Sequence, residues 1–267
     1  MSTHLEKIMA TTLLRVMERK QAADLGHLEA LAKAHQPRGF AAGLRSVAST
    51  GPAIISEVKK ASPSRGVIRA DFQPAWIAQR YQSAGAAAIS VLTDEDYFQG
   101  SLADLQAVSR VVSIPVLRKD FILDPFQILE ARAAGADAIL LIVAAHPDAV
   151  LAELASEAAR RGLDVLCEVH NLSELERAVA LGFEVIGVNS RDLKTLEVKP
   201  ETHTELAAAM PSGVLRVAES GIRDSADIER LLGAGYNAFL VGETLMREPD
   251  PAVALAQLIG KAAPCAV

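Results

Sequence analysis

The sequence predicts an α/β fold, a closed (β/α)8 barrel with an N-terminal helical extension. Eight short apolar runs alternate with stretches long enough to hold a helix. Four of the runs follow a glycine of the kind that ends a helix. The length of 267 residues agrees with the roughly 250 residues usual for eight such units. Together these observations indicate a TIM barrel.

The four glycines recur at a nearly constant spacing. They are Gly85, Gly135, Gly182 and Gly235, and the intervals of 50, 47 and 53 residues each hold two strand–helix units. Glycine suits these positions because the left-handed conformation past a helix end costs it almost nothing. Solenoids also repeat at such lengths, and an open doubly wound sheet is the alternative fold, but eight even units favour the closed barrel.

The pattern of residues 1–48 predicts a helical extension, which packs on the barrel of residues 49–267 within one structural domain. Apolar residues from Leu5 to Met17 recur at intervals of three and four, which indicates a helix with one apolar face. A second helix is predicted over Leu25–Ala34 and ends before Pro37. Such a helix could mediate dimerisation or lie on a membrane, but its mixed acidic and basic polar side favours packing on the barrel.

The eight predicted strands follow in order. Each is short and aliphatic, as expected for strands buried on both faces of a parallel sheet. The composition agrees, because 50% of the residues are hydrophobic and only 4% are aromatic. The runs begin near Ala53, Ala87, Pro115, Asp137, Asp164, Glu184, Val214 and Asn237.

Charge and cysteine content exclude several classes. A net charge of −6 argues against a nucleic-acid or anionic-membrane partner, although local basic pockets can still bind small anions. Cys167 and Cys265 belong to no CxxC pair, so no disulfide framework or zinc site is predicted. The first 20 residues lack the apolar core of a signal peptide, and the longest apolar run, 138–145, is far shorter than the ~20 residues of a membrane span. We therefore expect a cytoplasmic protein.

Polar residues end several predicted strands, where barrel enzymes place their active sites. Glu57 and Lys59 close the first strand and share one face, because side chains alternate along a strand. The later strands end in Lys119, Glu168, Asn189 and Ser220. Charges in such a recess must be paired or bind a ligand. We interpret them as a ring of two lysines and two glutamates around one opening, which favours an enzyme.

Two glycines after the last two strands predict a phosphate site. Gly221 follows Ser220, and Gly242 precedes Glu243, so bare backbone N–H groups can approach a ligand there. In this fold the loops after strands seven and eight often bind phosphate.

Other features carry less chemistry. The acidic and aromatic loop 93–98 is interpreted as a solvated turn. His146, His170 and His203 are isolated, so we expect hydrogen-bonded or surface roles and no metal site. Strand alternation points Cys167 toward the helical layer. The glycines at 233–235 precede a strand, unlike a dinucleotide fingerprint.

The strand ends together resemble the indole-3-glycerol phosphate synthase family. The resemblance extends from the N-terminal helix to about Leu245. Ala61 departs from the pattern, since some members carry a basic residue there, and the N-terminal helix is less charged than is common. The motifs are Glu57-x-Lys59-x-x-Ser62-Pro63-Ser64, Pro115-Val116-Leu117-Arg118-Lys119-Asp120-Phe121, Glu168-Val169-His170, Gly187-Val188-Asn189-Ser190-Arg191-Asp192-Leu193, Glu219-Ser220-Gly221-Ile222 and Val241-Gly242.

The resemblance implies a lyase of tryptophan biosynthesis. The expected reaction closes the ring of 1-(2-carboxyphenylamino)-1-deoxy-D-ribulose 5-phosphate with loss of carbon dioxide and water, giving indole-3-glycerol phosphate. It implies a small phosphorylated substrate and no metal or organic cofactor. It leaves association with other enzymes of the pathway open.

The resemblance also assigns roles. Lys119 is the expected general acid, because an ammonium with a pKa of about 10.4 stays charged at pH 7. Glu168 is expected to transfer protons during dehydration, assisted by Glu57. The residues expected to orient or bind the substrate and its phosphate are Asn189, Ser220, Lys59, Ser62, Phe121, Arg191, Gly221, Gly242 and Glu243.

Two alternative functions stay open from the sequence. Another phosphate-binding barrel, such as a phosphoribosylanthranilate isomerase, would have Cys or Asp at the first strand end, where this chain has Glu57. A non-catalytic barrel that acts as a scaffold for the pathway would not need the charged ring.

Overall fold

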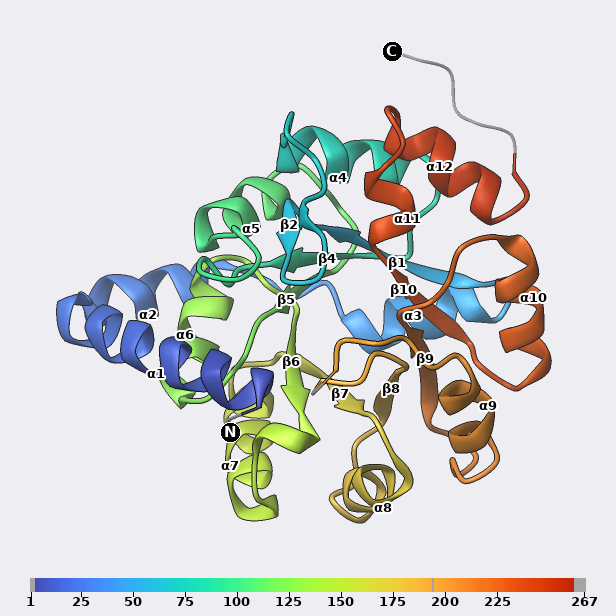
Figure 1. The fold of residues 1–267 in the computed structure, drawn as a ribbon. Helices are drawn as coiled ribbons and strands as arrows, with labels where there is room; N and C mark the ends of the chain where they lie inside the picture. The colour runs from blue at the N-terminus through green and yellow to red at the C-terminus, as the bar shows by residue number, and fades with distance from the viewer. Residues whose placement is uncertain (1–2, 194, 262–267) are drawn as a thin grey trace.

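The computed structural model describes residues 3–193 and 195–261 of the chain. Its parallel strands close into a barrel in the order β1-β10-β9-β8-β7-β6-β5-β4, and helices surround them (Figure 1). The ring closes where β1 pairs with β10, with Ala53 beside Ala238. The predicted (β/α)8 barrel is therefore confirmed.

Each barrel strand begins at its predicted residue or one residue later. A short hairpin of β2 (Ala61–Ser62) and β3 (Gly66–Val67) lies in the loop after β1 and is not part of the barrel. The barrel strands are β1 (Ala53–Val58), β4 (Ala88–Leu92), β5 (Val116–Lys119), β6 (Ala138–Ile142), β7 (Asp164–Val169), β8 (Val185–Asn189), β9 (Leu215–Glu219) and β10 (Ala238–Val241).

Helices follow the strands as the glycine pattern predicts. The four glycines that precede strands have positive φ angles, from 78° at Gly182 to 95° at Gly85, where a side chain would be strained. The helices are α4 (Pro74–Ser83), α5 (Leu102–Ser109), α6 (Pro125–Ala133), α7 (Asp148–Arg160), α8 (Leu172–Ala180), α9 (Glu201–Ala207), α10 (Ser225–Gly233), α11 (Glu243–Met246) and α12 (Pro251–Leu258), with a 3-10 turn η1 (Val143–Ala145) after β6.

The apolar core has two parts because side chains alternate along each strand. Ile55 belongs to the part inside the barrel, whereas its neighbour Ile54 belongs to the part between strands and helices. Cys167 is buried in the outer part, as predicted from alternation. Cys265 lies outside the described residues.

Three helices precede the barrel, one more than the sequence indicated. They are α1 (His4–Ala22), α2 (Leu25–Ala34) and α3 (Phe40–Ala48). The unpredicted α3 buries Phe40 and Leu44 against the first residues of the strands and so covers the N-terminal end of the barrel. The division at residue 48 stays a prediction, and this packing supports one structural domain.

Helix α1 contacts α6 and reaches the opposite end of the barrel (Figure 1). Arg19 donates a hydrogen bond to Glu130 of α6 at 2.8 Å, and the N-terminal residues of α1, including Leu5 and Ile8, line the cavity described below. No helix among the described residues has the length and apolar character needed to cross a membrane.

Candidate active site

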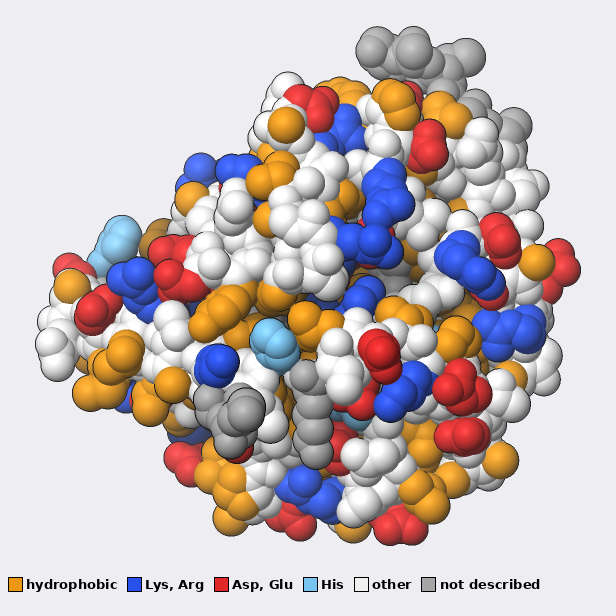
Figure 2. All heavy atoms as spheres, in the orientation of Figure 1, with side chains coloured by type: hydrophobic (Ala, Val, Ile, Leu, Met, Phe, Trp, Pro, Cys, Tyr) orange, Lys and Arg blue, Asp and Glu red, His pale blue; other side chains and the backbone are white. Residues whose placement is uncertain are grey.

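A cavity of about 720 Å³ lies at the C-terminal ends of the barrel strands. Figure 2 looks onto this face, and basic side chains gather at the rim of the hollow. Every site residue expected from the sequence lines this one cavity. They are Glu57, Lys59, Ser62, Lys119, Phe121, Glu168, Asn189, Arg191, Ser220, Gly221, Gly242 and Glu243.

At the floor of the cavity one ammonium faces two carboxylates. Lys119 Nζ lies 2.9 Å from Glu168 Oε2 and 3.4 Å from Glu219 Oε2. Both carboxylate side chains are only 2% exposed. Neither oxygen of Glu219 has a hydrogen-bond partner among the described residues. We call Lys119, Glu168 and Glu219 the Lys119 cluster.

Glycine at position 187 makes room for this cluster. Gly187 lies in β8, between the strands that carry Glu168 and Glu219. A Cβ atom on Gly187 would lie 2.0 Å from Glu219 Oε1. The carboxylate can therefore approach β8 only because no side chain is there.

The three side chains of the Lys119 cluster differ in their protonation at neutral pH. Burial raises the pKa of Glu219 to about 8, so it holds a proton at neutral pH. Burial also disfavours ionisation of Glu168, but the Lys119 ammonium and the His170 imidazolium outweigh it and hold the pKa of Glu168 well below its usual range. Burial alone would lower the pKa of Lys119, yet the surrounding glutamates raise it above its usual value. A charged acid, an ionised base and a protonated carboxyl thus meet at one point.

Glu57 and Lys59 form a second pair at the same end of the barrel. Lys59 Nζ lies 2.5 Å from Glu57 Oε1, and both side chains are largely buried. A Cβ on Gly242 would lie 2.3 Å from the same Glu57 oxygen. Gly242 therefore makes room for the Glu57 side chain. The sequence analysis predicted only a phosphate-binding role for this glycine.

The loops after β9 and β10 offer backbone donors and basic side chains. Ser220 and Gly221 have φ angles of 66° and 75°. The backbone N–H groups of Gly221 and Gly242 find no acceptor in the described parts of the chain. The Glu243 carboxylate contacts three arginines that also line the cavity, which leaves an excess of positive charge. These are Arg65 at 3.1 Å, Arg191 at 4.0 Å and Arg247 at 2.5 Å.

Polar and apolar residues complete the walls. Asn189 Oδ1 accepts a hydrogen bond from the Arg191 backbone N–H at 3.0 Å, and the Arg191 guanidinium donates to the Leu196 carbonyl at 2.9 Å. These bonds orient Arg191. The apolar part of the wall includes Leu5, Ile8, Phe98, Phe121, Leu140 and Ile142.

The sequence interpretation missed some residues of the site. Glu219 ends β9 as Glu168 ends β7, so the same strand-end signal could have identified it. The hydrogen-bonded role expected for His170 is confirmed by its bond to Glu174, but its contact with Glu168 of the site was not expected. The interpretation of loop 93–98 as a solvated turn was wrong for Thr93 and Asp94, which are buried, and Asp94 lines the cavity.

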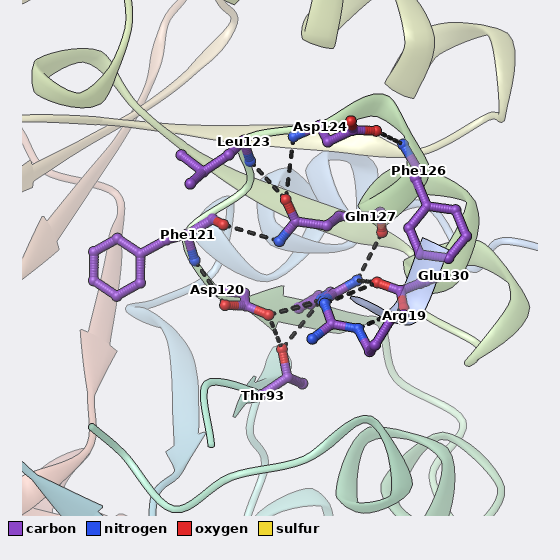
Figure 3. A network of polar contacts seen from close by, with 10 residues as sticks. Arg19, Thr93, Asp120, Phe121, Leu123, Asp124, Phe126, Gln127 and Glu130 are labelled. Carbon is purple, nitrogen blue, oxygen red and sulfur yellow. Dashed lines mark hydrogen bonds and ion pairs between the residues drawn. The ribbon is translucent and has the colours of Figure 1, made fainter. Parts of the chain in front are cut away.

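A second charged cluster adjoins the site, and one of its carboxylates, Asp120, also lines the cavity (Figure 3). Arg118 precedes Lys119 and points away from the cavity, where its guanidinium is fully buried. It contacts Asp120 at 2.8 Å and Glu130 at 3.4 Å. It also donates to Thr93 at 3.1 Å and to the Gln127 carbonyl at 2.7 Å. We call Arg118, Asp120 and Glu130 the Arg118 cluster.

Residues 5–258 match the family model described as "Indole-3-glycerol phosphate synthase". The chain belongs to the indole-3-glycerol phosphate synthase family. One relative, the indole-3-glycerol phosphate synthase of Koribacter versatilis (strain Ellin345), is 54% identical over 260 residues, which cover 97% of this chain and 100% of the relative.

Solved structures of lower identity share the barrel fold. An N-acetylmannosamine-6-phosphate 2-epimerase from Clostridium perfringens is similar at a TM-score of 0.59 and 15% identity, covering 75% of this chain and 91% of that chain. A mandelate oxidase mutant is similar at a TM-score of 0.58 and 18% identity, covering 79% and 71%.

Membership of the indole-3-glycerol phosphate synthase family confirms the family and the lyase activity expected from the strand-end motifs. The same match favours this activity over a phosphoribosylanthranilate isomerase and over a non-catalytic scaffold.

Proposed function

We propose that this chain closes the indole ring inside the cavity, with the Lys119 cluster at the reacting atoms. The observation that carries the proposal is the position of Lys119 Nζ, within 3.4 Å of two buried carboxylates at the C-terminal ends of β7 and β9, the strands on either side of β8. An acid, a base and a protonated carboxyl in one recess match a reaction that needs several proton transfers.

In the first step, Lys119 gives a proton to the substrate carbonyl. The aromatic carbon that bears the carboxylate attacks the carbonyl carbon, a C–C bond forms, and the oxygen becomes a hydroxyl. The carboxylate then leaves as carbon dioxide, and its bonding electrons restore the aromatic ring. The high pKa of Lys119 keeps the donor charged at neutral pH.

In the second step, the hydroxyl leaves as water and a C–H proton is removed from the adjacent carbon. Ionised Glu168 is the base, and Glu57 assists it from across the cavity. Glu219, which holds a proton below about pH 8, is a further proton source for the leaving hydroxyl. The two electron pairs balance, since the C–H pair forms the new double bond as the C–O pair departs.

The remaining walls bind the substrate. The backbone N–H groups of Gly221 and Gly242, with Glu243 orienting nearby arginines, suit the phosphate. Phe121 and the apolar wall suit the aromatic ring. The residues that meet the substrate carboxylate or orient the intermediate are Lys59, Arg191, Asn189, Ser220 and Ser62.

Turnover assays test these roles. Mixing the purified protein with the carboxyphenylamino substrate should produce indole fluorescence, and Lys119→Ala should abolish most of the signal. Glu168→Gln should lower kcat by about 10²–10⁴-fold, the usual contribution of a general base. Glu184→Gln is the matched control, because its side chain is 82% exposed at the far end of the barrel. Wild-type rates in both Glu168→Gln and Glu57→Gln across the pH profile would contradict the assignment.

We also propose that the protein works in the cytoplasm, where the buried thiol of Cys167 stays reduced. Cell fractionation tests the compartment. Association with other enzymes of tryptophan biosynthesis is proposed as well, and recovery of those enzymes with the tagged protein from cell extract would support it. Elution of the tagged protein without them would contradict it.

A further inference from the structure

Beside the Lys119 cluster, one histidine lies between two carboxylates. His170 Nδ1 is 3.0 Å from Glu174 Oε2, and His170 Nε2 is 3.2 Å from Glu168 Oε1. The His170 side chain is 10% exposed. It does not line the cavity, whereas Glu168 does. His170 therefore contacts Glu168 from the protein side, where the substrate does not reach.

The positions of the two carboxylates determine the charge of the ring. A neutral imidazole carries a single N–H, so one ring nitrogen would direct a lone pair at a carboxylate oxygen. An imidazolium has two N–H groups, so it can donate a hydrogen bond to Glu174 through Nδ1 and present a positive charge to Glu168 at the 3.2 Å ion-pair distance of Nε2. Burial alone would lower the pKa of His170, but Glu168 and Glu174 outweigh it and raise the pKa to about 10. The charged groups that face His170 are these two glutamates, with Lys119 and Glu219 beyond Glu168.

Helix α8 holds this arrangement in place. Glu174 lies in its first turn, and Oε2 also accepts the His170 backbone N–H at 2.8 Å. Glu174 Oε1 accepts a bond from the Asn171 amide at 2.6 Å, and Asn171 caps the helix by accepting the Glu174 N–H at 3.0 Å. Both carboxylate oxygens of Glu174 thus have hydrogen bonds, and Glu174 in turn holds the orientation of the His170 imidazole.

The two carboxylate oxygens of Glu168 form ion pairs with different cations. Oε2 faces Lys119 in the cavity, and Oε1 faces His170 behind it. When Lys119 turns to the substrate carbonyl, as in the reaction proposed above, the contact with Oε2 weakens. The contact with His170 is outside the cavity and persists.

We propose that His170, held by Glu174, is a positioning residue that keeps Glu168 ionised and in place while Lys119 is engaged with substrate. This inference rests on the proposed role of Glu168 as the base. It assigns His170 no contact with the substrate.

The pH dependence of kcat tests this proposal. His170→Gln keeps a hydrogen-bonding side chain but removes the charge, so the pKa of Glu168 should rise. The acidic limb of the kcat profile should move up by about 1–3 pH units, the effect of one nearby opposite charge. Above that limb kcat should return close to the wild-type value, and KM should stay unchanged. A profile that coincides with the wild type, or a uniform loss at all pH values, would overturn the proposal.

A second variant and an NMR measurement on the wild type keep the proposal testable even if His170→Gln does not fold. Glu174→Gln keeps the imidazole and should move the limb in the same direction, whereas Glu176→Gln, an exposed carboxylate on the same helix, should not. In ¹⁵N NMR of the wild type, both ring nitrogens of His170 should be protonated at pH 7. A single protonated nitrogen would overturn the proposal.

The NMR readout also separates this proposal from the catalytic assignment. If Glu168→Gln kept wild-type turnover, the assignment of the base would fail. The His170–Glu168 pair would still be tested, because the pKa of His170 measured by NMR should fall in Glu168→Gln. An unchanged value there would overturn the pair itself.

Discussion

Strand β5 carries two adjacent cations with opposite surroundings. Arg118 faces the helical layer, and each of its nitrogen atoms has a partner among the described residues. Lys119 faces the cavity, and its neighbour Glu219 has no hydrogen bond to any described residue. Both cations are paired with buried carboxylates. The difference is one of saturation, because the Arg118 cluster has its hydrogen bonds filled from the protein, whereas the described residues leave Glu219 of the Lys119 cluster without one.

Removing the cavity-facing cation should give the largest loss of activity. Lys119→Met should lower kcat by about 10²–10⁴-fold, because it removes the proposed general acid. Its loss of stability should be smaller than that of an Arg118 variant, since Glu168 keeps His170 and Glu219 is protonated at neutral pH. Turnover and urea unfolding of the same preparation measure both effects. A large loss of stability with intact turnover would break the comparison.

Removing Arg118, the helix-facing cation, should lower stability more than removing Lys119 does. Arg118→Met leaves the buried Asp120 without its cation and leaves Glu130 with Arg19 alone, so the free energy of unfolding should fall by about 3–5 kcal/mol. Urea unfolding checks this value. Arg110→Met is the control, because Arg110 is exposed and should change stability little. Equal effects of the two variants would show that the Arg118 cluster is not structural.

Adding one carbon atom at Gly187 should disturb only the unsaturated cluster. Gly187→Ala places Cβ 2.0 Å from Glu219 Oε1, so the carboxylate must move away from β8. We expect a loss of about 1–3 kcal/mol in stability and a lower kcat, as for other overpacked sites. Gly233→Ala is the control, since a Cβ there meets no atom within 4 Å. Identical behaviour of the two variants would contradict the tight fit.

The last expected effect is a change in the pH dependence of stability, and it should not alter turnover at a fixed neutral pH as strongly as the changes above. Glu219 has a pKa of about 4.5 when unfolded and about 8 in the folded chain. The folded state therefore binds the extra proton, and this stabilisation is present below pH 4.5 and lost as the pH rises through about 8. Glu219→Gln does not titrate, so it should gain stability relative to wild type between pH 5 and pH 9. Urea unfolding at both values measures the difference, and a difference that stays constant or reverses would contradict the raised pKa.

The strand positions followed from the sequence because they depend on local signals. Glycines with positive φ and short aliphatic runs located each strand within one residue. The strand-end rule also brought the expected site residues to one cavity. Contacts between distant segments could not be predicted in this way. Nothing near Gly187 in the sequence indicates that the Glu219 side chain occupies the space where a Cβ of residue 187 would lie. The pairing of Arg19 with Glu130, 111 positions apart, was equally hidden.

The pairing of β1 with β10 has a consequence for how the enzyme is made. Glu57 belongs to the first strand to leave the ribosome, but the glycine that accommodates it, Gly242, follows the last. A nascent chain of 220 residues already contains Lys119, Glu168 and Glu219, yet Glu57 still lacks its neighbour. Pairing of the last strand with the first therefore completes the surroundings of Glu57, the earliest translated of the strand-end residues that line the cavity.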